Sequence, residues 1–292
     1  MAGWNRTGPV VVEVDGSAEN LRLVEYAAAE ARRTSSRLEL IAPYSSRSSF
    51  ASGYSQKPVA EAADDAVQVA TAHLRHRGNH SLRLTGATGE GPRSRVLAHA
   101  AQNARMLVIA RSHGRGPERL VNTQVNLMLA ARAGCPLVVV PASWHSSTTD
   151  RKVAVGIDGT TLSSEALEFA FMTASQRDAD LIVVHSDVVA GHLPAGDDPE
   201  WSWLSRADHL LSETLTPWSS RFPDVKVTRF LSSRPPAAAL VHESGDVGLV
   251  VVGAHSGPGP VDPVARRSVA AMTCPVAIVP HHAATAESAN VA

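Results

Sequence analysis

The second half of the chain repeats the pattern of the first half, and this repeat constrains the fold more than any other feature. The first copy opens with the β-branched run Val10 to Val14, followed by Asp15-Gly16-Ser17 and a helical pattern. The second opens with Lys152 to Ile157, followed by Asp158-Gly159-Thr160 and another helical pattern, so Asp158 corresponds to Asp15. Such a repeat predicts two similar domains in tandem.

The ends of the two copies match as well as their beginnings. The run Cys135 to Pro141 (CPLVVVP) corresponds to the run Cys274 to Pro280 (CPVAIVP), at nearly the same spacing as the two aspartates. Between the copies lies the short Ser/Thr-rich stretch 142–150, which is typical of a linker. We therefore expect one domain over residues 1–143 and a second over residues 151–283.

Each copy alternates short apolar strands with helical patterns. In the first copy the strand runs read VVVEV, LELIA, SLRLTGATG, MLVIA and LVVVP. Continuous apolar strands separated by helices predict a mostly parallel sheet covered on both faces. Hydrophobic residues make up 44% and aromatic residues 4%, which suits closely packed helices on a sheet. The expected class is α/β, with two doubly wound, Rossmann-like domains that each hold a five-stranded sheet.

Composition argues against several partners. The 27 Lys and Arg residues are balanced by 28 Asp and Glu residues, and no long basic run is present, so nucleic acid is not expected to bind. No apolar stretch approaches the roughly 18 residues of a membrane span, and no signal-peptide pattern opens the chain, so we expect a cytoplasmic protein without a membrane partner. Cys135 and Cys274 are interpreted as small buried packing residues.

Candidate binding residues follow the strands that open each copy. Ligands of an open parallel sheet bind beyond the carboxyl ends of the strands, where strand order switches, and Asp15 and Asp158 occupy such ends. Each carboxylate could accept hydrogen bonds from an adenine amino group or a ribose, or it could simply cap the next helix.

A glycine-containing segment follows the fourth strand of each copy, at residues 110–117 and 252–259. Glycines there would let backbone N–H groups approach a phosphate ahead of a helix. They could equally serve only the sharp turn from strand to helix. His113 and His255 in these segments have no matched carboxylate or second histidine at ligand spacing, so we predict no metal site.

Three ordered motifs, present in both copies, resemble the universal stress protein family. These are DGS or DGT after the first strand, SHGRG or GAHSG after the fourth, and the final CPLVVVP or CPVAIVP. The resemblance implies a fold like that of the adenine nucleotide α-hydrolases, a bacterial stress-response role, and ATP as the possible cofactor. It implies these binding residues: Asp15, Pro43, Ala110, Gly114, Gly116, Val125, Asp158, Ser186, Val252, Gly253, Gly257, Ser268 and Val269.

Both copies depart from the glycine pattern of ATP-binding family members, which reads glycine, two residues, glycine, nine residues, then glycine with Ser or Thr. In the first copy Arg111 replaces the opening glycine, and Thr123-Gln124 stands at the closing pair. In the second copy Gly257 follows Gly253 after three residues, and Arg267 replaces the closing glycine. An arginine could supply lost phosphate donors, or it could fill the pocket and close it.

Three functions are compatible with this sequence. The first is a non-catalytic stress-response protein that binds, or once bound, adenine nucleotide. The second is a nucleotide-free interaction protein that acts through its variable loops, where Trp201, Trp203 and Trp218 form either a partner-facing patch or a local core. The third is a nucleotide-cleaving enzyme, which is disfavoured because no glycine-rich phosphate loop follows the first strand of either copy.

Members of this family commonly dimerise by pairing their final strands. Here the runs Leu137 to Val140 and Val276 to Val279 could pair within one chain and produce an intramolecular pseudo-dimer. A homodimer of the whole chain is a further possibility, since exposed strand edges invite pairing.

Overall fold

The computed structural model describes residues 4–45, 58–111, 129, 133–145, 151–158, 163–186, 200–255 and 263–281. The first copy contains β1 (Val10–Glu13), α1 (Ala18–Arg33), β2 (Leu38–Tyr44), α2 (Val59–His76), β3 (Leu84–Glu90), α3 (Arg93–Ala100), β4 (Met106–Ala110) and β5 (Leu137–Val140). The second contains β6 (Lys152–Ile157), α5 (Ser164–Arg177), β7 (Asp180–Ser186), α6 (Glu200–Arg221), β8 (Val227–Ser232), α7 (Pro236–Glu243), β9 (Leu249–His255), α8 (Pro263–Ala271) and β10 (Val276–His281).

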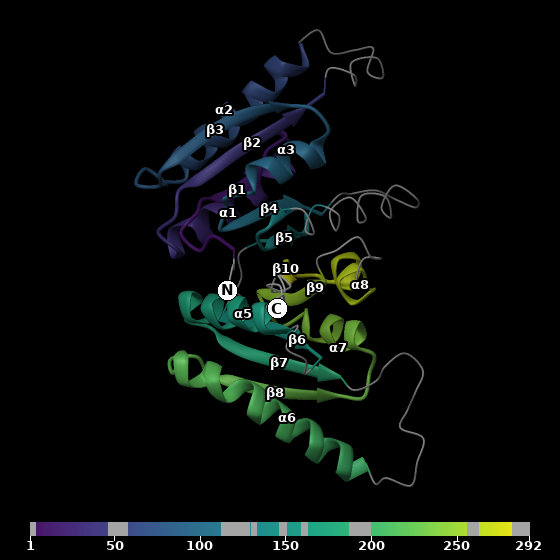
Figure 1. The fold of residues 1–292 in the computed structure, drawn as a ribbon. Helices are drawn as coiled ribbons and strands as arrows, with labels where there is room; N and C mark the ends of the chain where they lie inside the picture. The colour runs from purple at the N-terminus through teal and green to yellow at the C-terminus, as the bar shows by residue number, and fades with distance from the viewer. Residues whose placement is uncertain are drawn as a thin grey trace, which may run out of the picture.

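One ten-stranded sheet runs through both copies (Figure 1), in the order β3-β2-β1-β4-β5-β10-β9-β6-β7-β8. Within each copy the neighbouring strands are parallel. The α/β class and the mostly parallel sheet are therefore confirmed. The expectation of two separate five-stranded sheets needs correction, because β5 and β10 join them.

The two copies meet where β5 and β10 pair in antiparallel register. Val139 lies opposite Val276, and Leu137 lies opposite Ile278. Alone, each copy would leave one of these strands as an edge with unpaired backbone groups, and the pairing satisfies both edges at once. This is the arrangement expected for an intramolecular pseudo-dimer.

The cores consist of small aliphatic residues on strands that are buried on both faces. All four residues of β1 are buried, as are all four of β5. The helix α1 begins where the hydroxyl of Ser17 accepts the N–H of Asn20 at 3.2 Å, and it ends with Arg32 and Arg33 beside its carbonyl end. Local sequence signals thus set the ends of the helix that follows the first strand.

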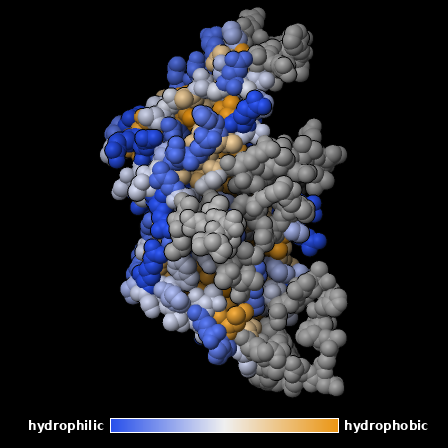
Figure 2. Space-filling view, in the orientation of Figure 1, coloured by the Kyte–Doolittle hydropathy of each residue, from blue (hydrophilic) through white to orange (hydrophobic). Residues whose placement is uncertain are grey.

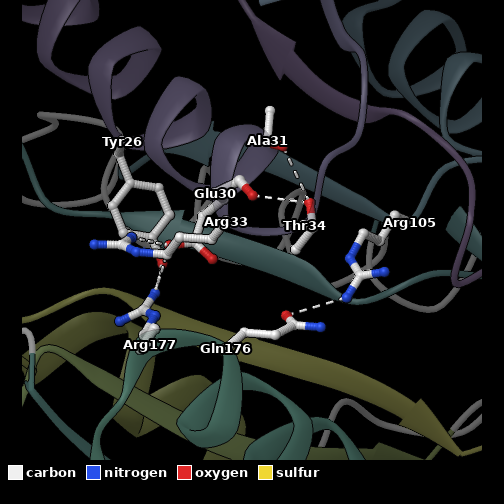
Figure 3. A network of polar contacts seen from close by, with 8 residues as sticks. All are labelled: Tyr26, Glu30, Ala31, Arg33, Thr34, Arg105, Gln176 and Arg177. Atoms are coloured by element: carbon white, nitrogen blue, oxygen red, sulfur yellow. Dashed lines mark hydrogen bonds and ion pairs between the residues drawn. The ribbon is translucent and has the colours of Figure 1, made fainter.

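Arginine side chains make polar contacts between the copies. Arg6 donates to Glu168 at 2.6 Å, and Arg105 donates to Gln176 at 3.2 Å. In the opposite direction, Arg177 of α5 donates to Tyr26 and to Glu30, both on α1 (Figure 3). The junction therefore combines backbone pairing with specific polar contacts.

On the face shown in Figure 2, apolar residues gather in small patches that are separated by hydrophilic ones. The exposed large hydrophobic residues among those described, Val69, Leu210 and Phe230, lie on different elements. Among the helices of the described ranges, none combines the length and the apolar character needed to cross a membrane.

Candidate functional site

The second copy contains a cavity of about 150 Å³ at the carboxyl ends of β6 and β9. From β6 the chain runs to β7 and β8 on one side of the sheet, and then continues to β9 and β10 on the other. The cavity therefore lies at the switch point, where ligands of doubly wound sheets bind. Its lining comprises Gly156, Ile157, Asp158, Ser163, Val184, Ser186, Pro236, Leu240, Val252, Gly253, Ala254, Val264 and His281.

A pair of hydrogen bonds with Ser163 fixes the carboxylate of Asp158, directly after the end of β6. The hydroxyl of Ser163 donates to Oδ1 of Asp158 at 2.7 Å, and the Asp158 N–H donates to the same hydroxyl at 3.3 Å. Elsewhere on the lining, Nδ1 of His281 lies 2.7 Å from Oε2 of Glu165. These contacts hold the polar groups in place around a largely aliphatic interior, an arrangement suited to a ligand with an apolar body and a few polar groups.

The cavity lining has no side chain at Gly156, where Leu240 of α7 packs against β6. A Cβ built at this position would lie 2.7 Å from Cδ1 of Leu240, which is closer than real Cβ atoms approach other heavy atoms. The glycine therefore lets the side chain of Leu240 pack closely against β6 where both residues line the cavity.

The first copy has charged residues, Glu13 and Arg93, at the positions that correspond to Gly156 and Pro236 of the second copy. Val10 pairs with Leu38 and Val153 pairs with Leu181, so Val10 of the first copy corresponds to Val153 of the second. In the same alignment Glu13 corresponds to Gly156. The helices α3 and α7 each follow a proline, and their first residues, Arg93 and Pro236, also correspond.

Glu13 and Arg93 form an ion pair through both carboxylate oxygens. Nη2 of Arg93 donates to Oε2 of Glu13 at 2.5 Å, and its Nε donates to Oε1. Glu13 is 9% exposed. The pair lies between β1 and α3, the place where the second copy has its cavity. The two copies are thus alike in fold and different at the switch point.

The remaining candidates of the first copy lie at strand ends. Asp15 is exposed, and its Oδ1 accepts the N–H of Ser17 at 2.8 Å, which is a turn contact. Pro43 and Ala110 are half-buried at the ends of β2 and β4. Val10 pairs with Met106 and Val153 with Leu249, so Ala110 corresponds to Gly253, not to Val252 as the loop motifs suggested.

Arg111 reaches into the other copy. Its Nη1 donates to the backbone carbonyl of Met272 at 2.5 Å and to that of Val269 at 3.3 Å, at the end of α8. Sequence reasoning offered two roles for this arginine, a phosphate ligand or a plug for its own pocket. The contact shows another role, a link between the copies.

Of the second-copy candidates, Asp158, Ser186, Val252 and Gly253 come together on the cavity lining. Ser268 and Val269 are buried on α8 and are not among the lining residues. Gly114, Gly116, Val125 and Gly257 lie outside the described residues, as do His113 and the side chains of His255, Trp201 and Trp203.

The motif-based reasoning missed Gly156, Ser163, Leu240 and His281. The contrast between Glu13 and Gly156 at corresponding positions of the repeat was the one available signal, because it marks a change from a charged side chain to none. No group of three His, Cys, Asp or Glu side chains within the described ranges could hold a metal ion.

Both cysteines are free and buried. Burial raises the pKa of the Cys135 thiol and that of the Cys274 thiol to about 12. Trp218 stacks on Phe171 with ring centroids 6.1 Å apart and packs against the core, in agreement with the local-core interpretation of this residue.

Two α/β copies joined through one sheet, with a cavity at the switch point of the second, define a tandem protein of the doubly wound α/β class. The model of the universal stress protein family matches residues 7–141 and 150–280. The chain belongs to the universal stress protein family.

The relatives include two universal stress proteins of Mycobacterium tuberculosis. Rv2005c is 37% identical over 170 residues, which cover 55% of each chain. Rv1996 is 29% identical over 274 residues, which cover 84% of this chain and 85% of the relative. The chain thus matches about half the length of the first of these. The crystal structure of a universal stress protein from Archaeoglobus fulgidus superposes with a TM-score of 0.64 at 12% identity, covering 95% of this chain and 98% of the other.

Proposed function

We propose that this protein is a stress-response module without dedicated catalysis that binds one adenine nucleotide per chain, in the cavity of the second copy. The contrast between the copies carries the proposal. At the switch point the second copy has a cavity whose lining includes Gly156 and Leu240, whereas the first has the ion pair of Glu13 and Arg93. Within the part of the chain that the structure describes, the switch-point cavity of the second copy supports a ligand site.

The lining suits the base and ribose of a nucleotide. Ile157, Val184 and Val252 provide apolar walls, and a volume of about 150 Å³ is one that accommodates an aromatic ring in other proteins. The Asp158 carboxylate, oriented by Ser163, is placed to accept hydrogen bonds from an amino group or from ribose hydroxyls. The phosphates would lie beyond Gly253, near the carboxyl end of β9.

Isothermal titration calorimetry with ATP on the nucleotide-free protein tests the proposal. We expect about one ATP per chain, and we expect Asp158→Ala to weaken binding at least about tenfold because a charge-assisted hydrogen bond is lost. Asp15→Ala removes the corresponding carboxylate of the first copy and is the matched control. It should leave the affinity unchanged. Two sites per chain, or equal losses in both variants, would contradict the proposal.

The alternative is a nucleotide-free interaction protein. Its support is the departure of both glycine segments from the family pattern, at Ala110, which corresponds to Gly253, and at Arg267. Mass spectrometry of small molecules extracted from gently purified protein separates the two functions. Stoichiometric adenine nucleotide supports the sensor, whereas an empty protein that also gives no heat with ATP supports the alternative.

A further inference from the structure

A second cavity, of about 240 Å³, lies at the junction between the copies and is lined by four arginines. Arg32 and Arg33 come from the last turn of α1, Arg77 follows α2, and Arg177 ends α5 of the other copy. Tyr26 and Trp144 form an aromatic part of the wall, with their rings edge to face and 5.1 Å between centroids.

The deep side of this cavity is held rigid by a buried carboxylate. Glu30, whose side chain is 4% exposed, lies 2.9 Å from Arg177 and 2.6 Å from Arg33 (Figure 3). Arg177 also donates to the Tyr26 hydroxyl at 2.8 Å. Burial raises the pKa of the Tyr26 phenol well above its ordinary value, so this hydroxyl stays neutral and adds no negative charge.

On the outer side, Glu25 faces the cavity and contacts Arg77 and His73. Its Oε1 lies 3.1 Å from Nε of Arg77 and 2.8 Å from Nε2 of His73. Arg32 donates to Oδ1 of Asn79, another lining residue. The guanidinium groups of Arg32 and Arg77 therefore lie at the rim, where Arg77 is 62% exposed.

The balance of charges leaves this cavity positive. Four guanidinium groups face two carboxylates, those of Glu25 and Glu30, for a balance of 4 − 2 = +2. The helices α1, α2 and α5 all end here, and their C-termini contribute roughly −0.5 each. Together these partial charges lower the balance to about +0.5, so the cavity stays weakly positive on a chain whose net charge is −1.

We propose that this junction cavity binds a small phosphate-bearing anion through the guanidinium groups of Arg32, Arg33 and Arg77, beside Arg177 of the other copy. The planar fork of arginine matches phosphate oxygens in paired hydrogen bonds. The occupant would bridge the copies, since α1 and α5 both supply charge to it. This site is separate from the switch-point cavity and does not depend on nucleotide binding there.

Calorimetry with inorganic pyrophosphate on the full chain tests this site. The double variant Arg32→Gln/Arg77→Gln removes two rim charges and leaves the buried contacts of Glu30 in place. We expect it to weaken pyrophosphate binding at least about tenfold. Arg229→Gln, which removes one exposed arginine on β8 at the far edge of the sheet, should bind as the unaltered chain does.

Two further comparisons complete the test. Asp158→Ala should bind pyrophosphate normally, because its altered side chain lies in the other cavity. ATP that binds Asp158→Ala, but not the triple variant Asp158→Ala/Arg32→Gln/Arg77→Gln, would identify the occupant of the junction cavity as a nucleotide. Pyrophosphate that binds Asp158→Ala, when ATP binds neither of these variants, would identify the occupant as a free anion. No pyrophosphate binding by the unaltered chain, or equal binding by the double variant, overturns the proposal and leaves the arginines as helix-end counterions.

Discussion

At the residue scale, one pair of positions distinguishes the switch points of the two copies by its charges. A buried carboxylate is costly unless a cation and hydrogen bonds offset its lost hydration, so Glu13 at 9% exposure requires Arg93. In the second copy the same two positions are Gly156 and Pro236, and neither carries a charge. Loss of Arg93 alone would leave the buried carboxylate of Glu13 without its cation.

A large side chain at position 156 should abolish ligand binding in the second copy. Gly156→Leu places a side chain against Leu240 and into the cavity, so we expect ATP affinity to fall at least about tenfold. Overpacking should also lower the free energy of unfolding by about 1–3 kcal/mol. Calorimetry and urea denaturation measure the two effects, with Glu13→Gln as the control that should leave ATP affinity intact. Unchanged affinity in Gly156→Leu would remove the switch-point cavity as the site.

At the scale of elements, the strands and four candidate residues at the strand ends of the second copy were predictable from the sequence. Short apolar runs and the repeat set the parallel sheet, and Asp158, Ser186, Val252 and Gly253 meet in one cavity as their strand ends suggested. The contribution of α7 was not predictable, because Leu240 reaches the cavity only through the packing of helix on sheet. The partners of Arg111 were also hidden, since they belong to the other copy and lie far from it along the chain.

The contact of Arg111 with the end of α8 should stabilise the junction. Arg111→Ala removes hydrogen bonds to the carbonyls of Val269 and Met272 and a cation beside a helix C-terminus. We expect the free energy of unfolding to fall by about 1–2 kcal/mol in urea denaturation. Arg111→Lys retains the cation without the fork and should lose less. Stability equal to that of the unaltered chain in Arg111→Ala would show that the contact contributes nothing.

At the scale of the whole molecule, the continuous sheet makes the two copies one structural unit. The strands β5 and β10 pair with each other and with the sheet of their own copy, so neither copy can unfold without exposing a strand of the other. Cys135 and Cys274 stand just before these two strands and are 1% and 7% exposed. The accessibility of these two thiols therefore reports whether the sheet around β5 and β10 is folded.

Thiol labelling should show both copies opening together. Burial raises the pKa of each thiol from 9.0 to about 12, so in the folded protein at pH 8 almost no reactive thiolate is present, whereas unfolded thiols react. In Cys135→Ala and Cys274→Ala, which leave one thiol each, labelling should begin at the same urea concentration. Labelling of one thiol at clearly lower urea would mean that the copies unfold separately.

Because the folded state resists ionisation of both thiols, their contribution to stability is full below pH 9, and the free energy of unfolding should decline as pH rises from 9 toward 12.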